Sequence, residues 1–125
     1  MHPGRPQIPT IDVQQAAAAR DDTPGSPVSP VLVDVRERDE FVNIRVPGAV
    51  LYPTSSFLLR FDELPRDRPL HVICQSGSRS TAVTAWLLRN GWSDVHNVAG
   101  GMTAWIRAGL ATRRGPLAPG EGDLP

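Results

Sequence analysis

Two short apolar segments limit how this chain can fold. Residues 31–35 read Val-Leu-Val-Asp-Val and residues 70–73 read Leu-His-Val-Ile, so both are mostly apolar and rich in β-branched side chains. Such runs are typical of strands that are buried on both faces of a parallel sheet. Residues 82–91 follow the second run with apolar residues at helical spacing and an Asn-Gly pair that ends the helix. This alternation of strand and helix predicts an α/β domain with a mainly parallel sheet.

The other predicted elements follow the same alternation. Further strands are expected at residues 8–11, 49–52 and 95–98, and further helices at 13–20, 37–42, 57–61 and 102–108. The first of these strands is predicted at a sheet edge because it contains Pro9. Asp12 and Gln15 have the spacing of a capping box, and Ser55 or Ser56 is expected to cap the helix at 57–61.

The length of 125 residues fits one domain. We expect this domain to span residues 8–110, with flexible ends at 1–7 and 111–125. The first of these ends is rich in proline and the second in glycine and proline. Residues 21–30 have the composition of a surface loop within the domain.

Composition and charge exclude several classes of function. The 13 basic and 13 acidic residues balance, which argues against a nucleic-acid-binding surface. No apolar run is long enough to span a membrane, and the first residues lack the apolar core of a secretory signal. A single cysteine rules out an internal disulfide and a cysteine-based metal cluster, and it suits a reducing compartment. We therefore expect a cytoplasmic protein with no metal and no nucleic-acid or membrane partner.

The only cysteine, Cys74, lies in the loop between the strand at 70–73 and the next helix. A lone cysteine is more often a small buried hydrophobe than a nucleophile. Core packing, however, does not require the small and polar residues that follow it. These are Gln75, Ser76, Gly77, Ser78, Arg79 and Ser80. A thiolate does benefit from them, because backbone N–H groups at a helix N-terminus lower its pKa and stabilise negative charge. Cys74 is therefore predicted to be a nucleophile, and residues 75–80 to bind its substrate.

Arg79 of this loop, and Asp34 and Arg36 outside it, have further predicted roles. Arg79 falls in the first helical turn, where the helix dipole disfavours a cation, so a specific role is expected. We predict that it bonds backbone carbonyls of the loop or contacts an anionic donor. Asp34 and Arg36 lie at the C-terminal end of the strand at 31–35 and are expected to support the loop. His71 lies three residues before Cys74 in a strand and thus on the opposite face, so a role as general base is not expected.

Four segments stand in the order found in rhodanese domains. They are residues 34–41 (DVRERDEF), 46–50 (VPGAV), 74–80 (CQSGSRS) and 98–105 (VAGGMTAW). On these segments the chain resembles a single-domain sulfurtransferase of the rhodanese-like family. The resemblance implies a five-stranded parallel sheet with helices on both faces and a cysteine that carries a persulfide. Thiosulfate or a persulfide would be the donor, and cyanide, a thiol or a protein cysteine the acceptor. No cofactor is expected.

Two alternatives remain beside sulfur transfer. Related phosphatases and arsenate reductases separate their cysteine and arginine by five residues, whereas Cys74 and Arg79 are separated by four. The shorter loop favours a sulfur atom over a tetrahedral phosphate. The other alternative is a non-catalytic sulfur-binding or interaction module, against which the intact cysteine argues. Gln75 replaces an arginine that is frequent at this position, so weak use of thiosulfate is expected.

Overall fold

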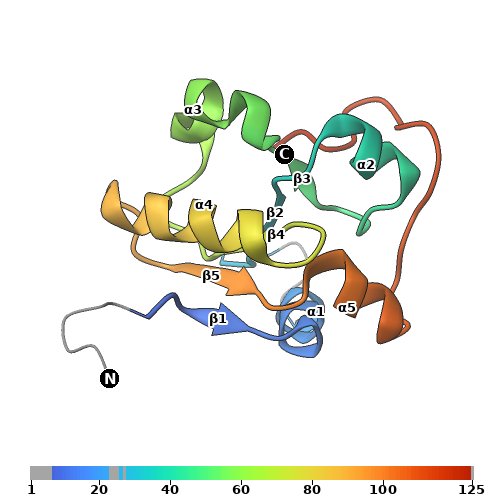
Figure 1. Ribbon diagram of the computed structural model, residues 1–125, viewed down its shortest axis with the longest axis horizontal. Helices are drawn as coiled ribbons and strands as arrows, with labels where there is room; N and C mark the ends of the chain where they lie inside the picture. The colour runs from blue at the N-terminus through green and yellow to red at the C-terminus, as the bar shows by residue number, and fades with distance from the viewer. Residues whose placement is uncertain (1–6, 23–25, 27, 125) are drawn as a thin grey trace.

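The computed structural model describes residues 7–22, 26 and 28–124, and within them a parallel five-stranded sheet (Figure 1). The strands are β1 (Thr10–Ile11), β2 (Val31–Asp34), β3 (Val50–Leu51), β4 (Leu70–Ile73) and β5 (Val95–Val98). Their order across the sheet is β1-β5-β4-β2-β3, and every pairing is parallel. The predicted α/β fold is confirmed, with the Pro9-containing segment leading into an edge strand. The predicted loop at 21–30 falls partly outside the described residues.

Four helices join these strands and a fifth follows β5 in the described part of the chain. They are α1 (Val13–Asp22), α2 (Arg38–Asn43), α3 (Phe57–Arg60), α4 (Ser78–Arg89) and α5 (Gly101–Arg107), and 3-10 turns flank α3. The Asp12–Gln15 capping box is present, with each side chain bonding the other residue's backbone N–H. Two details differ from expectation. Helix α4 begins at Ser78 rather than at residue 82, and Ser56 precedes α3 without a side-chain cap hydrogen bond.

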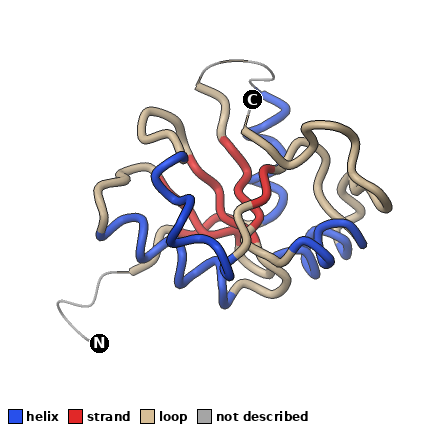
Figure 2. The backbone as a smooth tube through the Cα atoms, turned by 90° about the horizontal axis from the view of Figure 1, so that it is seen from above, coloured by secondary structure: helices blue, strands red, loops and turns tan. Residues whose placement is uncertain are grey.

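The strands lie in the middle of the molecule with helices around them (Figure 2). Successive side chains of a strand point to opposite faces of the sheet, and each face packs into its own apolar layer. Val72 and Cys74 face a layer that contains residues of α3 and α4, including Phe57 and Leu87. Ile73 faces the other layer, which includes residues of α1, α2 and α5. The three tryptophans pack in these layers, with Trp92 and Trp105 buried and Trp86 half-buried. The strand that precedes the cysteine is thus packed on both faces.

The C-terminal segment differs from the expected flexible end. It returns along α2 and β3, where Arg45 and Arg113 bond each other's backbone and the Leu51 N–H donates to the Gly122 carbonyl at 2.7 Å. The Glu121 carboxylate accepts hydrogen bonds from the buried guanidinium of Arg45, at 2.5 and 3.0 Å. The physical reason is that β3 is an edge strand whose outer backbone groups need hydrogen-bond partners, and Arg45 is a buried cation that needs an anion. The C-terminal segment supplies the Gly122 carbonyl to the strand and the Glu121 carboxylate to the cation.

No helix among the described residues is both long enough and apolar enough to cross a bilayer.

Candidate active site

The predicted site residues gather where parallel strands end. Asp34 ends β2, Cys74 follows β4, and Gly100 and Gly101 follow β5, so all three strands bring their carboxyl ends to one edge of the sheet. Ligands of open α/β sheets bind at this edge. The segments at Asp34, Cys74 and Gly100–Gly101 therefore lie together at this edge.

The sulfur of Cys74 lies beneath its own loop. The residue is fully buried, and its Sγ accepts a hydrogen bond from the Gly77 N–H at 3.1 Å and lies 3.3 Å from Ser80 Oγ. Burial alone raises the pKa of the Cys74 thiol. Hydrogen bonds from Ser80 and from the backbone of Gly77 and Ser76 outweigh burial, so the net result is a lowered pKa. The loop thus favours a thiolate at the start of α4.

Gly77 gives the loop its turn into α4. Its φ of 112° lies in the left-handed region, which a residue with a Cβ adopts only with strain. In this conformation the Gly77 N–H points at the sulfur, and the Gly77 carbonyl accepts hydrogen bonds from the side chains of Ser80 and Thr81. Ser76 and Ser78 are exposed on the outer side of the loop.

The first turn of α5 holds the other side of the loop. The Met102 N–H donates to the Cys74 carbonyl at 2.9 Å, and the Thr103 N–H donates to the Gln75 carbonyl at 3.1 Å. The Thr103 hydroxyl donates to the same carbonyl at 3.1 Å. Two N–H groups in the first turn of α5 are therefore satisfied by carbonyls of the cysteine loop.

Arg79 makes an ion pair that the sequence prediction missed. Its guanidinium contacts both carboxylate oxygens of Glu40 on α2, at 2.7 and 3.0 Å, and not the loop carbonyls. The predicted bonds from Arg79 to the loop carbonyls are therefore wrong, because α2 places Glu40 opposite the first turn of α4. The ion pair lowers the pKa of Glu40 to about 2. Glu40 lies in the DVRERDEF segment that carried the family resemblance, but sequence alone does not pair it with a residue 39 positions away.

Asp34 and Arg36 form an ion pair at the end of β2, and their support of the loop stays a prediction. Both are buried, and the Arg36 guanidinium bonds both Asp34 carboxylate oxygens, with Nη2 at 2.8 Å from Oδ2. Arg36 also bonds the Ile44 carbonyl and lies 3.4 Å from Gln75 Oε1. The Gln75 side chain therefore lies between Arg36 and Thr103, to which its Nε2 donates at 3.2 Å, rather than free beside the sulfur.

His71 lies on the face of β4 opposite Cys74, as the alternation of strand side chains requires. Its ring packs at right angles against that of His96, with centroids 5.9 Å apart. Burial, and secondarily His96, lower the pKa of His71 to about 4. This histidine does not reach the thiol.

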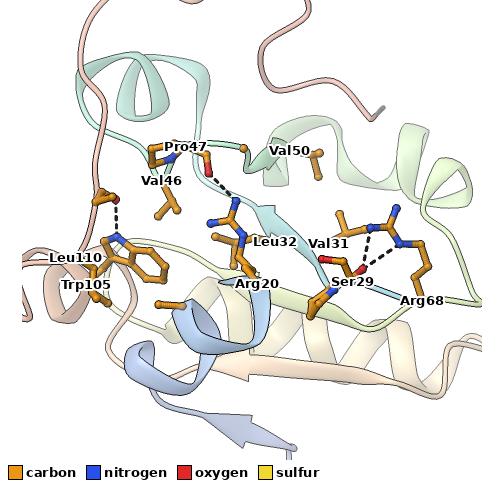
Figure 3. A pocket seen from close by; sticks show the side chains of 14 residues that line it. Arg20, Ser29, Val31, Leu32, Val46, Pro47, Val50, Arg68, Trp105 and Leu110 are labelled. Atoms are coloured by element: carbon orange, nitrogen blue, oxygen red, sulfur yellow. Dashed lines mark hydrogen bonds between the residues drawn. The ribbon is translucent and has the colours of Figure 1, made fainter. Parts of the chain in front are cut away.

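One surface hollow adjoins the cysteine loop and another does not. The first, of about 560 Å³, is lined by Ser76, Gly100, Thr103 and residues at the start of α1. The second, of about 480 Å³, lies at the opposite end of β2. Figure 3 shows Arg20 bonding Pro47 and Arg68 bonding Ser29 within this second hollow. It contains no nucleophile of the predicted site, so it is separate from the thiol.

Known proteins are similar to this chain in sequence and in fold. The family model of the rhodanese-like domain matches residues 12–108. The chain belongs to the rhodanese-like domain family. A protein named sulfurtransferase from Allochromatium vinosum is 36% identical over 92 residues, covering 74% of this chain and 81% of that protein. The thiosulfate sulfurtransferase GlpE of Pseudomonas syringae is 35% identical over 95 residues, covering 76% and 84%.

The fold of this rhodanese-like domain is also found among solved structures. A rhodanese-related protein from Thermoplasma volcanium superimposes with a TM-score of 0.75 at 24% identity, covering 85% of this chain and 98% of that one. The five-stranded parallel sheet with helices on both faces, expected from the family resemblance, is confirmed.

Proposed function

We propose that this rhodanese-like protein is a sulfurtransferase that carries sulfane sulfur on Cys74. The Cys74 thiolate attacks the outer sulfur of a donor such as thiosulfate. A new S–S bond forms, the donor's S–S bond breaks, and sulfite leaves with the electron pair. Cyanide, a thiol or a protein cysteine then attacks the outer sulfur of the Cys74 persulfide. This second step regenerates the thiolate, so the reaction is two-step covalent catalysis without a cofactor.

The observation that carries this proposal is the set of donors around one buried sulfur. The Gly77 N–H, the Ser80 hydroxyl and the dipole of α4 all favour negative charge at Cys74, and they lower its pKa. The same groups are suited to the anionic persulfide. Relatives named sulfurtransferase, two of them matched over about three quarters of this chain, support the same activity.

The short loop supports sulfur as the transferred group. Four residues separate Cys74 from Arg79, and the Arg79 guanidinium is already paired with Glu40. A phosphate ester would require N–H groups around three equatorial oxygens and a guanidinium to bind them. A full ion pair at Arg79 and complete burial of Cys74 favour a donor that presents a single sulfur atom.

Intact mass spectrometry gives the direct test. After exposure to thiosulfate and removal of excess donor, we expect one added sulfur, and its loss on addition of cyanide with release of thiocyanate. The Cys74→Ser variant is expected to gain no sulfur and to lose turnover, because the chain has no second cysteine. Near-normal turnover in Cys74→Ser, or faster hydrolysis of an aryl phosphate than sulfur transfer by the unaltered protein, would contradict the proposal.

A further inference from the structure

Two buried polar residues, Ser80 and Asn97, form a chain of hydrogen-bond contacts that begins at the sulfur of Cys74. Ser80 on α4 is fully buried, and Asn97 on β5 is 6% exposed. The Ser80 hydroxyl lies 3.3 Å from Cys74 Sγ and 2.6 Å from Asn97 Oδ1, and it is also 3.1 Å from the Gly77 carbonyl. Asparagine is depleted in strands, yet here it occupies a buried position of a strand in the sheet. The placement of Asn97 thus calls for an explanation other than strand propensity.

The hydroxyl of Ser80 has one proton for three acceptors. While Cys74 is a thiol, its S–H can donate to Ser80 Oγ, and Ser80 can then donate to Asn97 Oδ1. Once Cys74 is a thiolate, the sulfur only accepts, and Ser80 must turn its proton toward it. Two oxygens without a proton would then face each other at 2.6 Å, unless the amide of Asn97 rotates and donates through its Nδ2.

We propose that Asn97 is a positioning residue whose amide directs the Ser80 hydroxyl toward or away from the sulfur of Cys74. Asparagine suits both protonation states because its side chain carries an acceptor and a donor on the same carbon. Aspartate, with the same shape, carries two acceptors when ionised and holds the Ser80 proton away from the sulfur. This inference rests on the proposed function only in that Cys74 reacts as a thiolate.

The charged side chains near Cys74 belong to other positions, so replacing Asn97 or Ser80 removes none of them. Arg79 on α4, which interacts electrostatically with Cys74, is paired with Glu40 on α2. The Asp34–Arg36 pair lies at the end of β2. Asp12 and Arg107 line the hollow beside the loop. A change in the ionisation of Cys74 on substitution of Asn97 therefore reports on the Ser80 hydrogen bond or on a charge introduced at position 97.

The test is the pH dependence of Cys74 alkylation by iodoacetamide, with thiolate absorbance near 240 nm as a second readout. Ser80→Ala is expected to move the midpoint up by about one pH unit, a tenfold fall in thiolate fraction at neutral pH, because a hydrogen bond to a charged group is lost. Asn97→Asp is expected to raise the midpoint pH by about one unit as well, and Asn97→Ala to raise it by about half a unit. The matched control is Thr84→Val. Thr84 is buried one turn further along α4, and its hydroxyl has no hydrogen-bond partner among the described residues.

Double variants separate the hydrogen-bond route from direct charge. In a Ser80→Ala background, we expect Asn97→Ala and Asn97→Asp to add little further shift. Equal shifts in both backgrounds, or a wild-type midpoint in both Asn97 variants, would overturn the proposal. If Asn97→Asp fails to fold, Asn97→Ala alone decides, since it introduces no charge. Alkylation requires no sulfur donor, so this result is independent of whether the protein transfers sulfur.

Discussion

Gly101 lies directly against the carbonyl group of Cys74. A Cβ at this position would overlap the Cys74 oxygen and would lie 2.7 Å from the carbonyl oxygen of Gln75. The backbone φ of Gly101 is +56°, so both conformation and space favour glycine. This contact lets the first turn of α5 donate hydrogen bonds to the cysteine loop.

Gly101→Ala is therefore expected to destabilise the protein and to reduce sulfur transfer. Gly109→Ala is the matched control, because Gly109 has a φ of +71° but nothing within 4 Å of an added Cβ. The control is expected to lose about 1 kcal/mol of unfolding free energy from backbone strain alone. Gly101→Ala is expected to lose at least about 1 kcal/mol more, because backbone atoms must move. Urea unfolding measures both variants, and equal losses would contradict the prediction.

The Arg79–Glu40 ion pair should stabilise the start of α4. Glu40→Gln is expected to lower the unfolding free energy at pH 7 by roughly 1 kcal/mol, since both side chains are partly exposed. The pKa of Glu40 is about 2 when folded and its ordinary value is 4.5, so this stabilisation is present above pH 4.5 and is lost as the pH falls toward 2. Wild type and variant should thus converge at low pH. Asp62→Asn, at the exposed Asp62–Arg66 pair, is the control and should change little.

The C-terminal segment should contribute to stability through Glu121. Its carboxylate has a pKa lowered to about 2, chiefly by hydrogen bonding with Arg45, which is 1% exposed. Glu121→Gln is expected to lower the unfolding free energy, because a buried guanidinium loses its carboxylate partner. The loss should be largest above pH 4.5 and should vanish as the pH falls toward 2. Asp123→Asn is the control, and a thermal melt in which the two variants behave alike would refute the role of Glu121.

His71 should make the protein less stable in mild acid. Its pKa is about 4 when folded and 6.5 ordinarily, so protons bind the unfolded chain first as the pH falls through 6.5 toward 4. Between pH 7 and 5 we expect a loss of roughly 2 kcal/mol in unfolding free energy. Protonation of Glu40 and Glu121 changes the unfolding free energy only below about pH 4.5, because their pKa values are lowered to about 2. In urea unfolding of His71→Val, the unfolding free energy should depend less on pH between 7 and 5. An unchanged pH dependence would show that His71 does not cause the loss.

The sequence predicted the sheet, the helices and the position of Cys74 because these depend on local patterns. The apolar run at 31–35 and the small-residue loop after Cys74 each occupy a short window, and each produced the expected element. The five-stranded sheet implied by the family resemblance agreed with the five strands predicted from these patterns. Such patterns specify the backbone and the face that a side chain occupies.

Contacts between distant segments were not predictable in this way. Arg79 was predicted to bond loop carbonyls or to contact an anionic donor, whereas the structure places Glu40 beside it. Asn97 was read as part of a strand, and only the fold brings it to Ser80. The glycine- and proline-rich composition after residue 111 indicated a flexible end. It could not reveal that an edge strand and a buried arginine needed hydrogen-bond partners.

The order of the strands determines how Cys74 moves when the protein fluctuates. Strand β4 is paired with β2 on one side and β5 on the other, while β1 and β3 lie at the edges. In native-state hydrogen exchange, edge strands open in small fluctuations and central strands open mainly in global unfolding. The amides of β4 should accordingly be among the slowest to exchange. The nucleophile is then attached to the most persistent part of the domain, so partial opening at either edge would leave its geometry intact.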